Sequence, residues 1–278
     1  MFVVRGIRDS SHSMWVEQIS KKAVNLYGDE KNVITPDYGF FSAFQFLMKP
    51  TRVKNIDKFR DAYTEVLAEN PLTRFDYIGH SNGTYILGHS VDTTSTMTFD
   101  NVVLAAPVLP IEFNLNRIIN ETKQVKKLRY DTSVWDWPVG ILSQMIRALN
   151  FHDVGPSGLV KFDGGDHFIN NDTVQLVGWH DGGHGAALED ENLQHLVNFA
   201  YYGNDIKTGG NEHLLDENSW QFKVMRIFSS LTPYVLWGIL FLGIYHIWKL
   251  WRQKRLTLLM IVKWAGIAFV FGIALSVV

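Results

Sequence analysis

Short apolar runs alternate with longer amphipathic segments along most of the chain. The apolar runs are of strand length and stand at 2–6, 32–36, 74–79, 101–107, 125–131 and 173–179. Apolar residues at helical spacing predict helices at 14–28, 56–70, 83–91, 138–149 and 188–202. A strand followed by a helix, repeated in this way, predicts an α/β fold with a mostly parallel sheet and helices on both faces. The lack of alternation between polar and apolar residues in NVVLAAP at 101–107 favours a strand that is covered on both sides.

The C-terminal part of the chain has a different pattern, with very few polar positions. Two long apolar runs, 233–251 and 256–278, are separated by the basic segment RQKR at 252–255. Because about 20 apolar residues are enough for a helix to cross a membrane, the two runs predict a hairpin of transmembrane helices. Trp237 and Trp248 stand where aromatic residues line a membrane interface.

The pattern therefore divides the chain into three parts. We expect a globular domain at 1–216, a polar connector at 217–232 and the apolar hairpin at 233–278. A hairpin buried in the core of a soluble protein is the alternative, but so apolar a stretch would need a large partner surface to cover it.

The orientation of the predicted hairpin rests on two signals that disagree. Its loop carries Lys249, Arg252, Lys254 and Arg255, and the positive-inside tendency would place this loop in the cytosol and the globular domain outside. The chain, however, opens MFVVRGIRDSSHS, which lacks the basic and apolar regions of a secretory leader. We favour a cytosolic domain on a C-terminal membrane anchor. A hairpin that dips into one leaflet would satisfy both signals and stays open.

Composition narrows the chemistry. The 278 residues suffice for a sizeable core, the formal net charge of -2 gives no reason to expect a nucleic-acid partner, and there is no cysteine. Disulfides, thiolate catalysis and cysteine-bound metals are therefore excluded.

A candidate nucleophile lies in the segment GHSNG at 79–83. Ser81 directly follows a predicted strand and precedes a predicted helix, with Gly79 and Gly83 at the spacing G-x-S-x-G. A sharp turn at this junction exposes a serine at the carboxyl end of a parallel strand, where open α/β sheets bind ligands. An ordinary turn with serine as the helix N-cap is the other interpretation.

A serine nucleophile needs a base, because its own pKa is far too high. The segment GWHDGGHGAALED follows the last predicted strand and offers His184 first and His180 second. Its glycines would let the loop bring an imidazole back towards the serine. His80 is adjacent to Ser81, and we interpret it as structural because its side chain would point away.

The acid that orients the histidine should follow a strand between the serine and the histidine. Asp136 is the first choice and Asp131, at the end of the predicted strand, is the second. Asp163 and Asp166 lie in a polar insertion and are weaker candidates. A metal site is a poor alternative, because HDGGH and DGGDH stand in glycine-rich loops without a supporting ligand pattern.

The order Ser…Asp…His, the elbow GHSNG and the segments WDWPV and GGHGAAL resemble the α/β-hydrolase family over residues 2–202. In that family the acid often opens a D-x-x-V segment and the histidine follows the last strand in a Gly-His context. The resemblance therefore implies Asp136 and His184 as the partners of Ser81.

The resemblance also implies an oxyanion hole made of two backbone N–H groups. One would belong to Asn82, and the other to Ile7 or Arg8 in the loop after the first strand. Members commonly carry His-Gly in that loop, whereas this chain has Arg5 before Gly6.

The expected function is that of a membrane-anchored serine hydrolase that cleaves carboxylic esters through an acyl-enzyme, with no metal or organic cofactor. The connection between 101–107 and 125–131 is too short for the helical lid of capped relatives, and 150–172 is the other loop that could shape a site. An uncapped site beside a membrane favours an amphiphilic ester or thioester. A catalytically silent binding module and an acyltransferase with the same three residues are the alternatives.

Overall fold

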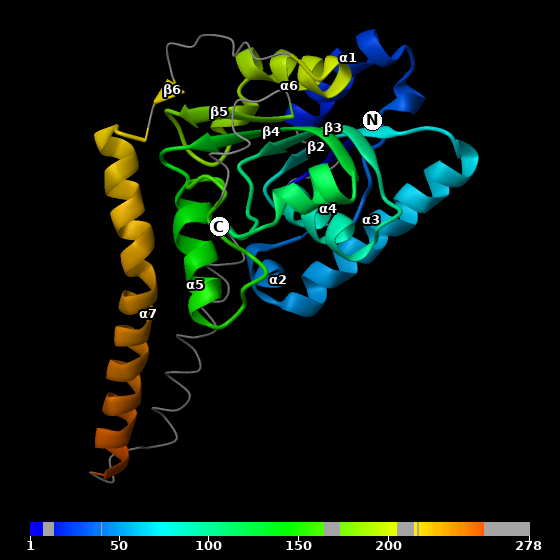
Figure 1. The fold of residues 1–278 in the computed structure, drawn as a ribbon. Coiled ribbons are helices and arrows are strands. Elements are labelled where there is room, and N and C mark those ends of the chain that lie inside the picture. Colours follow the sequence, from blue (N-terminus) through cyan, green and yellow to red (C-terminus); the bar gives the residue numbers. More distant parts are fainter. Residues whose placement is uncertain (8–13, 40, 164–172, 205–213, 216, 253–278) are drawn as a thin grey trace.

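A computed structural model describes residues 1–7, 14–39, 41–163, 173–204, 214–215 and 217–252. Five parallel strands form one sheet in the order β1-β2-β3-β4-β5, and a short β6 pairs antiparallel with β5 (Figure 1). The strands are β1 (Phe2–Val4), β2 (Phe75–His80), β3 (Phe99–Ala105), β4 (Val125–Ser133), β5 (Val174–His180) and β6 (Leu214–Leu215). The predicted α/β fold with a parallel sheet is confirmed.

Helices cover both faces of this sheet. The helices of the described residues are α1 (Met14–Tyr27), α2 (Ala43–Leu47), α3 (Lys49–Glu69), α4 (Asn82–Thr93), α5 (Ser143–Ala148), α6 (Asp190–Tyr202) and α7 (Trp220–Arg252), the last of which extends away from the sheet. Short helical turns are η1 (Glu30–Asn32), η2 (Arg117–Glu121), η3 (Pro138–Leu142) and η5 (Ala186–Leu188). In Figure 1, α1 and α6 lie on one side of the sheet and α3 and α4 on the other.

Side-chain alternation along the strands explains the two layers. Val3 and Ile78 belong to the apolar cluster under α1 and α6, whereas the neighbouring Phe2 and Tyr77 belong to the cluster with α3 and α4. Successive strand residues point to opposite faces, so both faces of a wholly buried sheet must be apolar.

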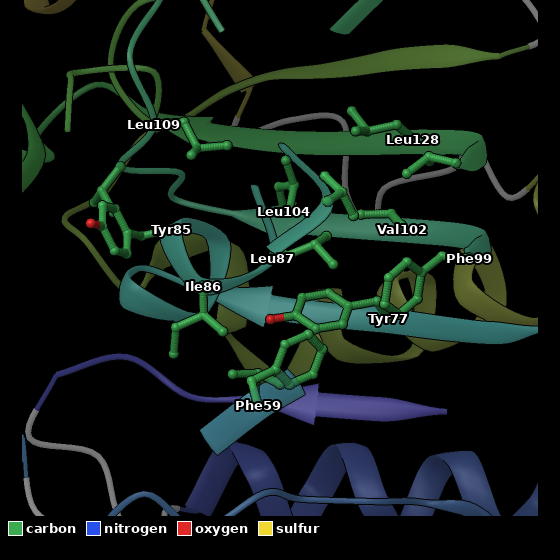
Figure 2. Close-up of a cluster of buried hydrophobic side chains, with 14 of the residues drawn as sticks. Phe59, Tyr77, Tyr85, Ile86, Leu87, Phe99, Val102, Leu104, Leu109 and Leu128 are labelled. Atoms are coloured by element: carbon green, nitrogen blue, oxygen red, sulfur yellow. The ribbon is translucent and has the colours of Figure 1, made fainter. Parts of the chain in front are cut away.

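A cluster of aromatic side chains packs α3 against β2, the strand that leads to Ser81 (Figure 2). The ring of Tyr77 packs edge to face against two other rings. Its centroid lies 5.6 Å from that of Phe59 and 5.7 Å from that of Phe99. The hydroxyl of Tyr77 donates a hydrogen bond of 2.7 Å to the carbonyl of Gly83. The largest apolar cluster therefore reaches directly to the turn that carries Ser81.

Two predicted elements differ from the structure in the first half of the chain. The strand predicted at 32–36 is only an isolated bridge between Ile34 and Phe2, because Pro36 has no N–H with which to extend the ladder. The helix predicted from residue 56 begins at Lys49. Its polar first turns include Arg52, which is buried by an ion pair with Asp153 that local pattern could not reveal.

The predicted connector and hairpin are the largest correction. Residues 220–252 form one helix, α7, and not a connector followed by a hairpin that starts at Pro233. The Oγ atom of Ser219 accepts a hydrogen bond from the N–H of Phe222, which starts the helix early, and Pro233 lies inside it. The second predicted limb, at 256–278, lies outside the described residues.

Helix α7 is buried against the domain at its first turns and continues beside α5, where Met145 and Ile239 line the same apolar pocket. Phe222 and Met225 are buried in a cluster with Val134 and Trp179, whereas large apolar side chains are exposed from Ile227 onward. Within the part of the chain that the structure describes, α7 is the one helix long and apolar enough to cross a membrane.

Candidate active site

The turn between β2 and α4 holds Ser81 in a conformation that few residues adopt. Its backbone has φ 52° and ψ −117°, and its N–H donates a hydrogen bond of 3.0 Å to the carbonyl of Ala105 at the end of β3. Positive φ at a non-glycine residue is strained and is typical of a nucleophile elbow. The Ser81 side chain makes no capping hydrogen bond to α4, so the structure does not show an ordinary serine N-cap.

Both glycines of the elbow are required by close packing. A Cβ atom on Gly79 would lie 2.5 Å from the ring of Tyr77 and 3.1 Å from the backbone of Gly83. A Cβ atom on Gly83 would lie 2.2 Å from the carbonyl oxygen of Val4. The first turn of α4 therefore lies against the end of β1, which brings the turn that carries Ser81 next to the Arg5–Ile7 segment.

Asp136 and His184 form a pair in the loops after β4 and β5. The Nδ1 atom of His184 lies 2.9 Å and 3.0 Å from the two carboxylate oxygens of Asp136. The carboxylate is fully buried and also accepts a hydrogen bond of 3.0 Å from the N–H of Val139, whereas the His184 side chain is 21% exposed. This leaves Nε2 as the ring nitrogen of His184 that could take a proton from a nucleophile.

His80 connects this pair to the elbow. Its Nε2 atom lies 3.1 Å from the carbonyl oxygen of His184, and the two rings are 4.7 Å apart. Because His80 directly precedes Ser81, this contact places the backbone of His184 beside the turn that carries Ser81. The sequence interpretation of His80 as structural missed this contact, because nothing in the local pattern indicates its partner.

The second-choice residues, Asp131 and His180, form a separate pair deeper in the sheet. The Nε2 atom of His180 lies 3.1 Å from Oδ1 of Asp131, and Arg129 donates from Nε and Nη2 to the two carboxylate oxygens, each at 2.9 Å. Burial by itself raises the pKa of Asp131, but the Arg129 charge and the hydrogen bonds from Arg129 and His180 outweigh it and hold the pKa well below 3.8. The structure thus sorts the four candidate side chains into two Asp–His pairs.

The predicted oxyanion donors are described only in part. The N–H of Asn82 belongs to the first turn of α4, where amides have no acceptor within the helix. Ile7 is described and half-buried, and Arg8 lies outside the described residues. The Arg5 side chain is turned towards residues 37–39. Its Nη2 atom donates hydrogen bonds to Asp37 at 2.6 Å and to the carbonyl of Gly39 at 2.8 Å, which hold this loop in place.

The loops around this edge of the sheet pack against one another. The connection from β3 to β4 contains only the helical turn η2. The insertion after α5 lies on it, since a Cβ atom on Gly155 would be 2.6 Å from Pro110 and one on Gly158 would be 2.8 Å from the carbonyl of Pro107. The carbonyl of Gly158 accepts the N–H of Ser133 at 3.0 Å, which fixes the insertion to the end of β4.

Two further observations bear on the assignment. Among the described residues, no three His, Asp or Glu side chains are grouped as metal ligands would be. Comparisons with protein-family models and with curated proteins found no match to this chain.

Proposed function

We propose that this protein is a serine hydrolase that cleaves carboxylic esters through Ser81, His184 and Asp136. The observation that carries the proposal is the Asp136–His184 pair, whose histidine backbone is hydrogen-bonded to the residue before a strained serine. The proposed nucleophile, acid and base follow the carboxyl ends of β2, β4 and β5, the edge at which α/β sheets bind ligands.

In the proposed mechanism, Oγ of Ser81 attacks the acyl carbon while Nε2 of His184 takes the hydroxyl proton. The carbonyl electron pair moves to the oxygen, returns as the ester C–O bond breaks, and the leaving alkoxide receives the proton from His184. Water then attacks the acyl-enzyme on Ser81 in the same way, giving the acid and the free serine. Asp136 holds His184 in the tautomer with a proton on Nδ1 and stabilises the imidazolium.

Backbone donors would stabilise the oxyanion of each tetrahedral intermediate. The N–H of Asn82 is the first proposed donor, and an amide of the segment after β1, at Ile7 or Arg8, is the second. The contact of Gly83 with Val4 supports this arrangement because it brings the two segments together. Such a donor contributes about 3–4 kcal/mol to transition-state stabilisation.

The substrate class follows from the position of α7. Its exposed apolar surface supports a membrane anchor that keeps the domain beside a lipid surface, on the cytosolic side in our preferred orientation. Amphiphilic esters collect at such a surface, and the short β3–β4 connection leaves no room for a helical lid within the described residues. Full-length protein that remained soluble without detergent or lipid would contradict the anchor.

A fluorophosphonate probe tests the hydrolase directly. Full-length protein in membranes is labelled, digested and mapped by mass spectrometry, beside the variants Ser81→Ala and His184→Ala. We expect an adduct on Ser81 in the wild type and on neither variant. Circular dichroism shows whether each variant is folded.

The outcomes separate the alternatives. Labelling of Ser81, together with faster product release by unlabelled protein from an ester when alcohol is added than in water alone, would indicate acyl transfer. A folded wild-type protein with no adduct would overturn the proposal and leave a binding module built on a hydrolase-like fold.

A further inference from the structure

The loops that carry Asp136 and His184 are joined by backbone hydrogen bonds. The N–H of Val134 donates to the carbonyl of His180 and the N–H of Trp135 donates to the carbonyl of Gly182, each at 3.0 Å. The β4–β5 ladder thus continues past the sheet, almost to both residues of the pair. Any change in register between β4 and β5 would move Asp136 relative to His184.

A bulge in β5 sets that register. Tyr130 is opposite Leu176, but Thr132 is opposite Trp179, so β5 contains one extra residue between these pairs. Gly178 lies at the bulge with φ +80°, and the hydroxyl of Thr132 donates a hydrogen bond of 2.8 Å to its carbonyl. A bulge of this kind reverses the face on which the following side chains lie.

The bulge is what brings His180 to Asp131. Ser133 is opposite His180 and shares its face with Asp131, two residues earlier. In an unbulged register Trp179 would be opposite Ser133, and His180 would turn to the other face. The hydrogen bond from His180 to Asp131 therefore forms only in the bulged register.

Burial of the Asp131–His180 contact makes a change in the β4–β5 register costly. Asp131 and Arg129 are both fully buried, and His180 has a side chain only 6% exposed. A buried carboxylate that loses one of its donors is costly, so a slip of β5 would break a polar network that water cannot replace. The Asp136–His184 pair is more exposed, because the His184 side chain is 21% exposed.

We infer that Asp131 and His180 are positioning residues, which fix the separation of Asp136 and His184 through the bulged β4–β5 register. They do not touch the proposed substrate. Their effect on catalysis rests on the proposed function, but their effect on the geometry of the outer pair does not.

Two substitutions at His180 test the inference in the full-length protein. His180→Phe keeps an aromatic ring but removes the donor to Asp131, and His180→Gln keeps an N–H donor. Asp76→Asn is the matched control, because Asp76 is a partly buried carboxylate near the start of β2, at the opposite end of the sheet from the β4–β5 loops, and accepts hydrogen bonds from the Tyr27 hydroxyl and the N–H of Asn101. Each variant is examined with 15N-labelled histidine in detergent micelles.

The first readout is the low-field proton resonance of His184 Nδ1–H, assigned by its loss in His184→Gln. We expect it in the wild type, in Asp76→Asn and in His180→Gln, and expect it to vanish by exchange with water in a folded His180→Phe variant. This readout needs no turnover. An unchanged resonance in His180→Phe would overturn the inference whether or not the protein is a hydrolase.

The second readout is the kinetics of ester cleavage. We expect kcat of His180→Phe to fall by up to about 100-fold with little change in KM, because a misplaced base affects the chemical step more than binding. His180→Gln should recover most of kcat, and Asp76→Asn should retain it. Equal losses of kcat in Asp76→Asn and His180→Phe would point to general destabilisation and overturn the positioning role.

Discussion

Two Asp–His pairs at the same edge of the sheet have similar geometry and different surroundings. Asp131–His180 is buried at the ends of β4 and β5 with Arg129 as a third partner, whereas Asp136–His184 lies in the following loops with a partly exposed histidine. A contact near 3 Å between the two residue types is therefore not enough to identify a catalytic pair. Burial and the Arg129 partner distinguish the two pairs. We expect the inner pair, Asp131–His180, to stabilise the fold, and the outer pair, Asp136–His184, to exchange protons.

The largest effect should come from the outer pair. Asp136→Asn would leave His184 in the wrong tautomer, so kcat for any ester that the wild type cleaves should fall by about 10⁴-fold. Stopped-flow or steady-state assays on the same ester measure it. Asp163→Asn is the control, because Asp163 is an exposed loop residue and was a weaker candidate acid. A larger loss of kcat in Asp163→Asn than in Asp136→Asn would indicate that the catalytic acid lies in the insertion at 150–172.

The inner pair should dominate stability. Asp131→Ala leaves the Arg129 guanidinium buried without its carboxylate and should lower the free energy of unfolding by about 3–5 kcal/mol. Asp136→Ala should cost less, because its partner is a half-buried histidine that can be neutral. Urea unfolding of both variants measures the two losses of unfolding free energy, and equal losses would contradict the greater stabilising role of the inner pair.

A double variant sharpens that result. Arg129→Met combined with Asp131→Leu removes both buried charges and replaces them by apolar side chains. It should recover much of the stability that Asp131→Ala loses, because the penalty comes from the unpaired charge. A double variant as unstable as the single one would show that the pair contributes net stability.

Acid should reveal the inner pair as well. The pKa of Asp131 is depressed in the folded protein, so its stabilising contribution is complete above the ordinary value of 3.8 and is lost as the pH falls below it. Unfolding midpoints measured between pH 5 and about pH 2.5 should therefore fall less steeply in Asp131→Asn than in the wild type. An identical slope would contradict the assigned cause.

The smallest effect should come from the bulge in β5 that determines which histidine meets which aspartate. Gly178→Ala places a side chain at φ +80°, which should cost about 1–3 kcal/mol of stability. Gly185→Ala is the matched control in the neighbouring loop, because Gly185 has φ −97° and open space around its Cβ position. Denaturation midpoints should separate the two, and a harmless Gly178→Ala would show that the bulge tolerates other residues.

Much of the architecture was predictable because it depends on local pattern. Apolar runs of strand length and helices that end at glycine, such as Gly28 and Gly203, mark elements without reference to the rest of the chain. The elbow is likewise local, since Gly79, Ser81 and Gly83 are contiguous. The start of α3 was not predictable in this way, because Arg52 is a polar residue whose burial depends on Asp153 far along the chain.

The sequence by itself determined which residues could act, and only the tertiary structure decided how they pair. Two acids and two histidines at strand ends were evident from order and spacing, and both acids remained possible for either histidine. The pairing depends on a single extra residue in β5, since the bulge at Gly178 turns His180 inward to Asp131 and the following loop brings His184 to Asp136. Such a register shift is a property of two strands together, set by hydrogen bonds and burial between segments distant in sequence, and no pattern within one of them records it.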